Sequence, residues 1–486
     1  MDLSKLIKNI DVLEVLNFKD IDIKGISYNS NTINSHEIFV CLKGEHVDGH
    51  DFAQSAFEKG AVALMCEKPL NIEIPQIIVK STQESIADLA AAFYHNPTQS
   101  LNLMGVTGTN GKTTVAHLVQ KIFEANSKKC ALIGTLGYKM SSKDDYLEAK
   151  HTTPQAPQMQ ETLQKMLKAD VLNVITEVSS HALEQFRVKN CEFSTAIFTN
   201  LTQDHLDYHI TMDNYFNAKA KLFSALKKGC AAVINVDDKY SYALIEKVSE
   251  DVQILTYGVK NNADLMAKNV EFMSDGVMFD VCYKEQKLNF KLHLNGMFSV
   301  YNCLAAIGCA LVNGIALDVI KIALEETRSV AGRFEIVQTN PMVIVDYAHT
   351  PDGLENILRA ARELTPKDGN LICLFGCGGN RDCTKRPKMG KIAQQLADKI
   401  IITSDNPRSE DPQQIITDIL SGLALINPKT VFVESDRHLA IKLLKDISSE
   451  NDVLVLAGKG HENYQILADK TIHFDDREEV LKVFGE

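Results

Sequence analysis

The sequence predicts an α/β protein built from about three domains, and three observations lead to this fold class. The chain has 486 residues, whereas one domain usually holds roughly 100 to 200. From Leu101 onward, apolar strand patterns alternate with helical patterns, and the alternation restarts after about residue 329. A glycine-rich turn joins the first of these strands to a helix. Such alternation predicts largely parallel sheets covered by helices.

The composition indicates a soluble protein and narrows its partners. Hydrophobic residues make up 45% of the chain and charged residues 23%, a balance typical of folded globular proteins. The net charge of -12 argues against nucleic acid as the main partner, because counterion release needs a basic surface. Residues 1–10 lack the apolar core of a signal peptide, and no stretch reaches the ~18 apolar residues of a membrane span. The eleven cysteines form no CxxC pair, which favours reduced thiols over disulfides or a zinc site. We therefore expect a cytoplasmic protein without membrane insertion.

Changes of pattern divide the chain into three predicted domains, residues 1–98, 99–328 and 329–486. The first ends in HNPTQS, an Asn-Pro turn typical of a linker. The third contains five strand patterns, each followed by a helical pattern, which favours a separate, mostly parallel sheet with functional loops at its carboxyl edge. The strands expected along the chain are 37–42, 171–178, 195–200, 343–346, 371–375, 400–403, 431–433 and 453–456.

The glycine-rich turn from Gly105 to Thr114 indicates a nucleoside triphosphate site. Its sequence, GVTGTNGKTT, departs from the strict P-loop spacing because Val106 stands where the first glycine would be. Backbone N–H groups at the start of the following helix can still hold phosphate, while Lys112 neutralises it and Thr113 binds Mg²⁺. The alternative is a glycine-rich turn before an ordinary helix. The predicted nucleotide-binding residues of the loop are Gly108, Thr109, Asn110, Gly111, Lys112, Thr113 and Thr114.

Two polar residues that follow strands are candidates for the metal side of this site. Glu177 ends one predicted strand, and His205 follows the next in TNLTQDHLDYH. A carboxylate and an imidazole there suit an Mg²⁺ held mainly by oxygen and phosphate, although His205 could equally be structural. Lys219, on a helical pattern, reads from its local sequence as a solvated surface lysine.

The loops of the third domain carry further charged residues. Arg333, Asp346 and Arg381 each lie on a predicted turn, where a plain loop charge is the alternative. Arg408 in SDNPRSEDP precedes a predicted helix start at Asp411 and Pro412, and its guanidinium could receive a substrate carboxylate in two parallel hydrogen bonds. In AGKGHENYQ, Gly458 permits close backbone approach and Glu462 could accept from an ammonium group; a simple turn is the alternative.

Taken together, these motifs resemble the Mur ligase family in order and spacing over nearly the whole chain. The family's own loop is GTNGKTT, which accounts for the unusual P-loop spacing. The resemblance implies an N-terminal domain that binds the UDP part of the substrate, a central ATPase domain and a C-terminal Rossmann-like domain that receives an amino acid. The matching motifs are GTNGKTT, HTTPQ, EVSSHALEQFRV, TNLTQDHLDYH, YFNAKAKLF, NGMFSVYN, AGRFE, VDYAHTPDGLEN, GCGGNRD, DNPRSE and AGKGHE.

The resemblance also implies roles for individual positions. Where the family often has Asp-Ser-Arg at the uridine site, this chain has Asn29, Ser30 and Asn31. The implied uridine contacts are Ser30, Glu45, His46 and Val47, and the implied contacts to the muramoyl dipeptide are Thr152, Thr153, Ser179, Gln185 and Arg187. The implied ATP contacts beyond the loop are Asn302, Arg333 and Asp346, and the implied metal-side residues are Thr113, Glu177, His205 and Lys219, the last as a carbamate. Lys112, Lys219, His205 and Glu177 are the implied catalytic residues.

Within the family, the resemblance implies a ligase that adds meso-diaminopimelate to UDP-MurNAc-L-Ala-D-Glu. Arg408 decides the amino acid, because ligases of this type that add L-lysine generally lack it, whereas diaminopimelate carries a distal carboxylate for it. The residues that match the amino-acid pocket are Arg381, Asp405, Asn406, Pro407, Arg408, Gly458 and Glu462. The expected reaction consumes ATP with Mg²⁺, passes through an acyl phosphate and serves peptidoglycan precursor synthesis, and the protein is expected to act as a monomer on small molecules.

Three alternatives stay open at this point. A related ligase could join lysine or another amino acid to the same precursor. Folylpolyglutamate synthetase is a more distant relative, but the DNPR run and the uridine-domain signature argue against it. A regulatory GTPase could carry the same kind of loop, although the Asn-Lys-x-Asp motif expected of one is missing from the sequence.

Overall fold

The computed structural model describes residues 1–44, 47–148, 151–273, 275–328 and 330–485. The chain forms two compact units, each built from segments that are separate in sequence. The first unit contains residues 1–107, 128–196 and 221–230, and the second contains 108–127, 197–220 and 231–486. In the part of the chain that the structure describes, no helix has the length and apolar character needed to cross a membrane.

A five-stranded sheet organises the N-terminal part of the first unit, in the order β1-β5-β4-β3-β2. All neighbouring strands are parallel except β1 and β5. The strand predicted at 37–42 is confirmed as β3, two residues shorter. The strands are β1 (Val12–Leu16), β2 (Gly25–Ser27), β3 (Glu37–Val40), β4 (Ala61–Cys66) and β5 (Gln76–Val79). The helices are α1 (Leu3–Leu6), η1 (Gly49–Phe52), α2 (Ala53–Glu58), α3 (Thr82–Phe93) and η2 (Pro97–Ser100).

The rest of the first unit contains the strand that leads into the glycine-rich loop. Its strands pair in the order β6-β9-β7-β8, parallel except for the last pair. The strand predicted at 171–178 is β9, which ends at Glu177 as predicted. The elements are β6 (Asn102–Thr107), β7 (Cys130–Gly134), β8 (Gly137–Lys139), α5 (Ala156–Lys168), β9 (Asn173–Glu177) and α6 (Ser180–Glu184). Strand β10 (Thr195–Phe198) and helix α8 (Met212–Ser224) have residues in both units.

The second unit begins with helix α4 (Lys112–Ala125), which follows the loop. Val115, Leu118, Val119 and Ile122 are all buried on it, which confirms the predicted apolar face. α4 packs against α10 and α11. Strands β11 to β13 are parallel, and β13 to β15 form an antiparallel ribbon. The elements are α7 (Leu206–His209), β11 (Ala231–Asn235), α9 (Ser241–Ile245), β12 (Gln253–Gly258), β13 (Leu265–Met273), β14 (Gly276–Tyr283), β15 (Gln286–Leu292), α10 (Met297–Val312) and α11 (Leu317–Glu325).

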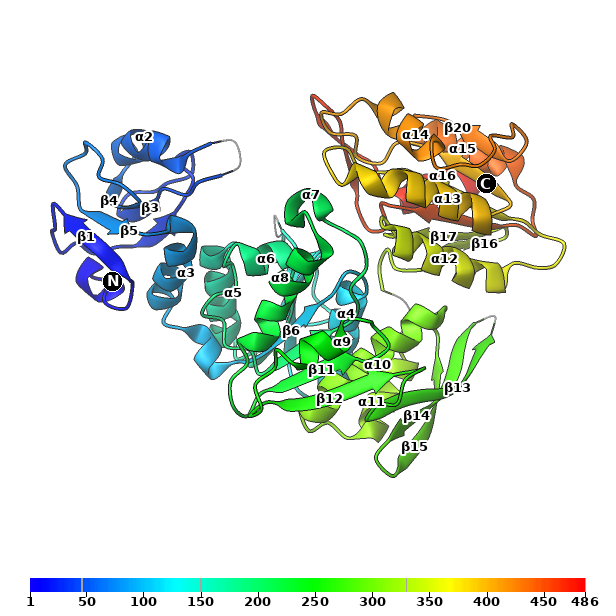
Figure 1. The fold of residues 1–486 in the computed structure, drawn as a ribbon, viewed down its shortest axis with the longest axis horizontal. Coiled ribbons are helices and arrows are strands. Elements are labelled where there is room, and N and C mark those ends of the chain that lie inside the picture. Colours follow the sequence, from blue (N-terminus) through cyan, green and yellow to red (C-terminus); the bar gives the residue numbers. More distant parts are fainter. Residues whose placement is uncertain (45–46, 149–150, 274, 329, 486) are drawn as a thin grey trace. The chain divides into compact units, whose positions relative to one another are not determined.

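The C-terminal part of the second unit is a six-stranded sheet in the order β16-β17-β21-β18-β19-β20 (Figure 1). All five predicted strands are present and parallel, and β16 adds an antiparallel edge strand. The strands are β16 (Glu335–Thr339), β17 (Met342–Asp346), β18 (Leu371–Phe375), β19 (Lys399–Ile402), β20 (Val431–Val433) and β21 (Val453–Ala457), followed by the hairpin β22 (Tyr464–Ile466) and β23 (Thr471–His473). The helices are α12 (Pro351–Leu364), η3 (Cys383–Lys385), α13 (Arg386–Leu396), α14 (Pro412–Leu420), α15 (Arg437–Ile447) and α16 (Asp476–Phe484).

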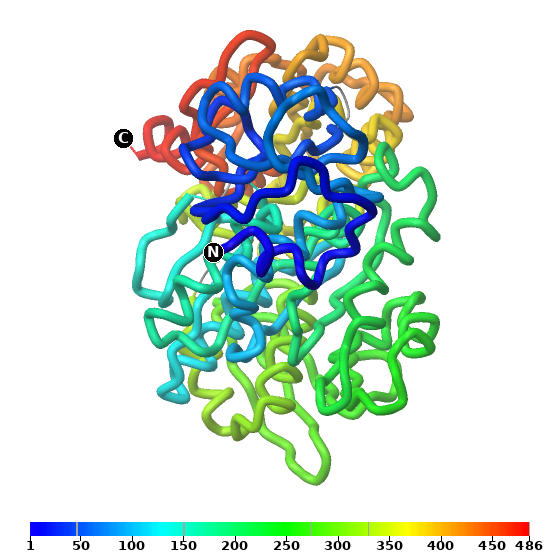
Figure 2. The backbone as a smooth tube through the Cα atoms, turned by 90° about the vertical axis from the view of Figure 1, so that its left-hand side faces the viewer, coloured from blue at the N-terminus to red at the C-terminus, as the bar shows by residue number. Residues whose placement is uncertain are grey.

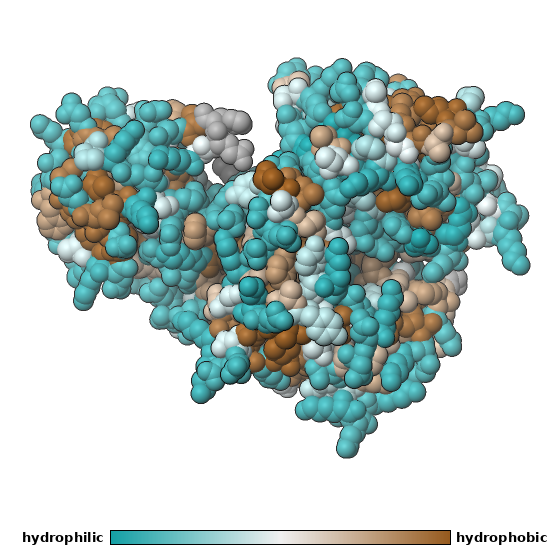
Figure 3. All heavy atoms as spheres, viewed as in Figure 1, coloured by the Kyte–Doolittle hydropathy of each residue, from teal (hydrophilic) through white to brown (hydrophobic). Residues whose placement is uncertain are grey.

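Helices cover both faces of this sheet, as expected for a parallel sheet with two buried faces. Side chains of α12, α13 and α14 share one core with Ile344 of β17, and side chains of α15 and α16 share another with Val343 and Val345. Neighbouring residues of the strand thus enter opposite cores, as the two-residue period requires. Figure 2 shows the last helix in red beside the orange segment that contains α15. The face in Figure 3 is mostly hydrophilic, broken by smaller hydrophobic groups.

Candidate active site

The glycine-rich loop is shaped by two glycines that no other residue could replace without strain. Gly108 has φ +154°, and a Cβ there would lie 1.9 Å from Thr199 Oγ1. Gly111 has φ +89°, precedes α4 directly, and a Cβ there would lie 2.3 Å from Asn302 Oδ1. The loop therefore brings bare backbone to the N-terminus of a 14-residue helix, where free N–H groups and the helix dipole favour phosphate.

Two lysine amines meet at this loop. Lys112 Nζ donates to the carbonyl oxygens of Gly108 and Thr109, both at 2.9 Å. Lys219 Nζ donates to the same Gly108 oxygen at 2.8 Å. Lys219 is only 2% exposed, so the surface-lysine interpretation of its local sequence is wrong. Burial, and then the neighbouring Lys112, hold the pKa of Lys219 well below its ordinary value.

Asp204 forms a buried ionic centre beside His205. Its carboxylate lies 3.3 Å from His205 Nε2, 3.7 Å from His349 Nε2 and 3.6 Å from Lys385 Nζ. Burial alone would raise the pKa of Asp204, but Lys385 and the two histidines hold it well below the ordinary value. His205 itself has φ +55° at the start of α7. The second unit thus places a carboxylate, an imidazole and a lysine together next to the predicted metal side.

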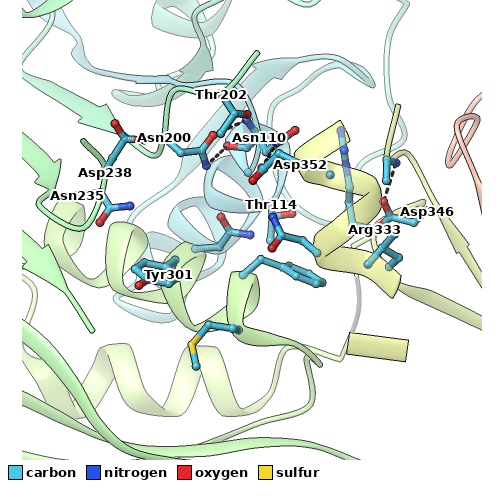
Figure 4. Close-up of a pocket in the computed structure, with 18 of the residues that line it drawn as sticks. Asn110, Thr114, Asn200, Thr202, Asn235, Asp238, Tyr301, Arg333, Asp346 and Asp352 are labelled. Atoms are coloured by element: carbon cyan, nitrogen blue, oxygen red, sulfur yellow. Dashed lines mark hydrogen bonds between the residues drawn. The ribbon is translucent and has the colours of Figure 1, made fainter. Parts of the chain in front are cut away.

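A cavity of about 340 Å³ opens beside the loop. Figure 4 shows Asn235, Asp238 and Tyr301 on one side and Arg333 and Asp346 on the other. Asn110 and Asp352 lie between them, joined by a 2.7 Å hydrogen bond. The predicted residues Asn110, Gly111, Thr114, Asn302, Arg333 and Asp346 all line this cavity. Its size suits a small ligand such as a nucleotide.

Arg333 links the cavity to the loop. Its Nη2 donates to Thr113 Oγ1 at 3.0 Å, and its guanidinium lies over the ring of Tyr347 with the carbon 4.7 Å from the ring centre. Arg333 Nε is buried and makes no hydrogen bond with any residue the structure describes. Asp346, at the end of β17, accepts backbone N–H groups of Phe334 and Ala348, both at 2.7 Å. Burial raises the pKa of Asp346, and the charge of Arg333 opposes this.

The residues predicted to hold the muramoyl dipeptide lie together in the first unit. Arg187 donates to Thr153 O at 3.0 Å and to Gln185 Oε1 at 2.7 Å. Thr153 Oγ1 donates to Glu177 O at 2.9 Å and lies 3.3 Å from Ser179 Oγ. One network therefore joins four of the predicted positions to the strand that ends at Glu177.

Thr152 and Glu177 connect to the same network through Thr135. Thr135 Oγ1 lies 3.2 Å from Thr152 Oγ1 and donates to Glu177 Oε2 at 3.0 Å. The Thr135 N–H donates to Glu177 Oε1, also at 3.0 Å. Glu177 belongs to the first unit, whereas Thr113, His205 and Lys219 belong to the second. The predicted metal-side residues therefore come from both units.

The predicted uridine contacts are described only in part. Ser30 is buried, and its carbonyl accepts from Lys59 Nζ at 2.9 Å. Val47 is 58% exposed. Glu45 and His46 lie outside the described residues.

The residues predicted to receive the amino acid lie on the loops after β18, β19 and β21, at the carboxyl edge of the C-terminal sheet, where parallel α/β sheets bind ligands. Arg408 Nη1 donates to Gly379 O at 2.9 Å and to Asn406 O at 3.3 Å. Gly378 lies between the two arginines, since a Cβ there would be 2.9 Å from Arg408 Nη1 and 3.8 Å from Arg381 Cγ. Burial, and then the charge of Arg381, lower the pKa of Arg408. Two neighbouring guanidinium groups suit a carboxylate.

Two acidic residues, Asp405 and Glu462, lie near Arg408. Asp405 is 5% exposed, and its Oδ1 is buried without a hydrogen bond from any described residue. Burial, and then the nearby Asp405, raise the pKa of Glu462. Both polar atoms of the Asn406 side chain are hydrogen-bonded. Its Nδ2 donates to Glu462 Oε2 at 2.8 Å, and its Oδ1 accepts from Ile466 N at 3.0 Å. Asn406 thus links Glu462 to strand β22. The predicted helix start at Asp411 and Pro412 is confirmed by a cap to Gln413 N.

Several residues of these sites received no role from the sequence, although some lie inside the recognised motifs. Asp204 directly precedes His205, Tyr347 follows Asp346, and Lys459 lies between Gly458 and Gly460. Asp237 accepts from the Tyr301 hydroxyl at 2.8 Å at the cavity wall and lies outside every motif. Among the described residues, no three or more His, Cys, Asp or Glu side chains gather in a way that could hold a metal ion by themselves.

Three family models match successive parts of the chain. Residues 22–96 match the catalytic domain of the Mur ligase family, residues 106–310 the Mur ligase middle domain, and residues 332–460 the glutamate ligase domain of Mur ligases.

Curated relatives match over nearly the full length. A UDP-N-acetylmuramoyl-L-alanyl-D-glutamate–2,6-diaminopimelate ligase of Bacillus velezensis is 45% identical, covering 98% of both chains. The ligase of the same description from Clostridium botulinum is 44% identical and covers 100% of both.

Solved structures show the same architecture. A structure of a UDP-N-acetylmuramoyl-L-alanyl-D-glutamate–2,6-diaminopimelate ligase is 32% identical with a TM-score of 0.66, and the match covers 95% of each chain. The folylpolyglutamate synthase of Mycobacterium tuberculosis, complexed with ADP, has a TM-score of 0.65 at 15% identity over 76% of this chain and 90% of that one, which is a likeness of fold alone.

Proposed function

We propose, from the premise that the chain belongs to the Mur ligase family, that it is an ATP-dependent ligase joining meso-diaminopimelate to UDP-MurNAc-L-Ala-D-Glu. The product is the UDP-MurNAc-tripeptide of peptidoglycan synthesis, and the enzyme works in the cytoplasm as a monomer. The observation that supports the choice of amino acid is that Arg408 lies near Arg381 and near the carboxylates of Asp405 and Glu462 at the carboxyl edge of the C-terminal sheet. Residues 1–98, 99–328 and 329–486 are the proposed domains for the UDP-sugar, for ATP and for the amino acid.

The reaction has two chemical steps. A carboxylate oxygen of the D-glutamyl residue attacks the γ-phosphorus of ATP, the bond to ADP breaks, and an acyl phosphate forms. The amine of diaminopimelate then attacks the acyl carbon, loses a proton and displaces inorganic phosphate, which gives the amide. Phosphoryl transfer depends mainly on positioning and charge stabilisation.

The second unit supplies the positive charge for the first step. Lys112 lies over the loop that would hold the phosphates, and Arg333 lies beside Thr113 with a buried Nε that has no hydrogen-bond partner among the described residues. Positive charge held in place before the reaction can stabilise the charge that develops on a transferring phosphoryl group. Tyr347 and Asp346 keep Arg333 and the wall of the cavity in place.

The residues predicted for the metal side carry donor groups that Mg²⁺ can take. Thr113 offers a hydroxyl oxygen, Glu177 a carboxylate and His205 an imidazole, and Mg²⁺ prefers oxygen ligands together with phosphate. These residues would hold the ion, which would neutralise charge on the phosphates and orient them.

Lys219 is proposed to act as a carbamate. Its amine is buried, lies 2.8 Å from the Gly108 oxygen and has a lowered pKa. A neutral amine can add to CO₂ with loss of a proton, which turns a cation into an anion beside the charged Lys112. The carbamate would complete the oxygen ligands of the metal side.

The remaining proposed contacts follow from the two other sites. Thr152, Thr153, Ser179, Gln185 and Arg187 hold the dipeptide in the first unit, where their hydrogen bonds already form one network. The proposed uridine contacts are Ser30, Glu45, His46 and Val47. In the amino-acid pocket, Arg408 and Arg381 receive the distal carboxylate, while Asp405 and Glu462 receive the ammonium.

The decisive experiment measures phosphate release from ATP with UDP-MurNAc-L-Ala-D-Glu and either meso-diaminopimelate, L-lysine or no amine. We expect phosphate and a new tripeptide only with diaminopimelate, because lysine would leave both arginines without a carboxylate. A site built for a polar group can reject an analogue without it by ~10⁴. Equal use of lysine would contradict the proposed specificity for diaminopimelate. Phosphate release that does not depend on any added amine would contradict the proposed ligase activity.

A further inference from the structure

A buried lysine without an assigned role lies in the proposed amino-acid pocket. Lys459 follows β21, and its side chain is 0% exposed. Lysine is almost never fully buried unless it is paired. The pairing of Lys459 therefore bears on what the pocket can bind.

The ammonium of Lys459 lies close to the carboxylates of Asp405 and Glu462 and to the side chain of Asn406. Its Nζ donates to Tyr464 O at 2.5 Å, to Glu462 Oε2 at 3.1 Å and to Asn406 Oδ1 at 3.4 Å. It lies 3.9 Å from Asp405 Oδ1. One cation thus joins the loop after β19 to the loop after β21 and the strand β22.

These contacts decide which carboxylate oxygens a ligand can use. Glu462 Oε2 is taken by Lys459 and by Asn406 Nδ2. Glu462 Oε1 has only a 3.5 Å contact to the Tyr464 hydroxyl, and Asp405 Oδ1 has no hydrogen bond from the part of the chain that is described. Glu462 Oε1 and the carboxylate of Asp405 therefore remain as acceptors for an incoming ammonium.

The positive charge of Lys459 offsets the negative charges of Asp405 and Glu462. The charge of Asp405 raises the pKa of Glu462, and the two side chains are only 7% and 11% exposed. Like charges in such a place favour the neutral form of one of them. A neutral Glu462 would bind a ligand ammonium weakly.

We propose that Lys459 is a positioning residue that determines specificity, fixing Glu462 and Asn406 and balancing the two carboxylates so that the pocket selects an amino acid with a second ammonium group. The proposal rests on the proposed function and deepens it, because the second ammonium belongs to the distal centre of diaminopimelate. Lys459 would not touch the substrate.

The test compares meso-diaminopimelate with 2-aminopimelate, which keeps the distal carboxylate and lacks the distal ammonium. In the wild type, kcat/KM should favour diaminopimelate strongly. In Lys459→Met, which keeps the length of the side chain without its charge, this preference should fall about 10-fold or more through a higher KM for diaminopimelate. The KM for ATP should stay unchanged, because the nucleotide cavity does not include Lys459.

Lys470→Met is the matched control, since Lys470 is exposed in the adjacent hairpin turn and its loss should leave the preference unchanged. If Lys459→Met does not fold, Lys459→Gln, which keeps a donor for Tyr464 O, is measured in the same way. An equal loss of activity with both amino acids would show a merely structural lysine and overturn the proposal. A wild type that joins neither amino acid would instead overturn the proposed function.

Discussion

His461 shows how its surroundings set the chemistry of a single side chain. Its ring lies 4.9 Å from that of Tyr347, and its buried Nδ1 has no hydrogen-bond partner among the residues described. Burial, and then the charges of Arg333 and Arg477, lower the pKa of His461 from 6.5 to about 3. The imidazole is therefore neutral in the folded protein at neutral pH.

This shift predicts a loss of stability in mild acid. The unfolded chain binds a proton at His461 below pH 6.5 and the folded chain only near pH 3, so stability falls as the pH drops through this window. The slope for one proton is about 1.4 kcal/mol per pH unit. Urea unfolding between pH 7 and pH 5 should show that the free energy of unfolding of His461→Gln changes less with pH than that of the wild type, by about the contribution of one proton. His473→Gln, at an exposed histidine, is the control, and equal slopes for His461→Gln and the wild type would contradict the assignment.

At the residue scale, the sequence predicted which residue types the sites contain better than it predicted their burial and contacts. The motifs named Lys219, Arg333 and Asp346, yet the local pattern of α8 gave no sign that Lys219 would be buried against Gly108. Helical periodicity reports which face is apolar, whereas the burial of a polar group depends on a partner far away in sequence.

At the scale of elements, one buried ion pair fixes the starts of α15 and α16. Arg437, the first residue of α15, donates to both carboxylate oxygens of Asp476, the first residue of α16, at 2.7 and 2.6 Å. Arg437 also donates to Ser404 O at 3.4 Å and to Ala457 O at 3.2 Å. These carbonyls directly precede Asp405 and Gly458 of the amino-acid pocket.

Removing one partner should therefore cost more than removing both. Arg437→Met leaves the Asp476 carboxylate buried and unpaired, which should cost about 3–5 kcal/mol, whereas Arg437→Met with Asp476→Leu replaces the pair by apolar groups and should recover most of that loss. Thermal unfolding checks the order of the two variants. A double variant no more stable than the single one would show that the carbonyl contacts, and not the ion pair, carry the stability.

The strands of the C-terminal sheet were predictable because both their faces are buried. Runs such as 371–375 and 453–457 are continuously apolar, which is typical of a central parallel strand. The sequence predicted no strand at the partly exposed edge strand β16 or at the ribbon β13–β15, and none at β7 and β11, although these two are fully buried. Edge strands lack the apolar run that marks a central one.

At the scale of the whole molecule, the residues proposed to bind the dipeptide and those proposed to bind the nucleotide lie in different units. The dipeptide network lies in the first unit, and the nucleotide cavity lies in the second. The order of motifs along the chain predicted the family, which the family models and the curated relatives confirm, whereas the site residues stay predictions. The order of motifs could not predict that each unit is assembled from separate segments, because local sequence patterns do not indicate which distant segments contact each other.

This division predicts that binding of the two substrates can be lost separately. Arg187→Met should raise the KM for the UDP-MurNAc-dipeptide at least 10-fold, because it removes a charge-assisted network, while ADP binds with unchanged affinity. Asn302→Leu, at the wall of the nucleotide cavity, should do the reverse. Calorimetric titration of both variants with both ligands checks this, and a parallel loss of both affinities in either variant would contradict it.

The carboxyl edge of the C-terminal sheet carries the amino-acid pocket on loops after β18, β19 and β21. The strands beneath contribute buried apolar side chains to the two cores and no group to the pocket. Selection on the amino acid and selection on folding therefore act on different residues. On the proposed function, a protein of this architecture would exchange one building block of a cell wall for another through changes in three short segments, while the six strands keep their order and packing.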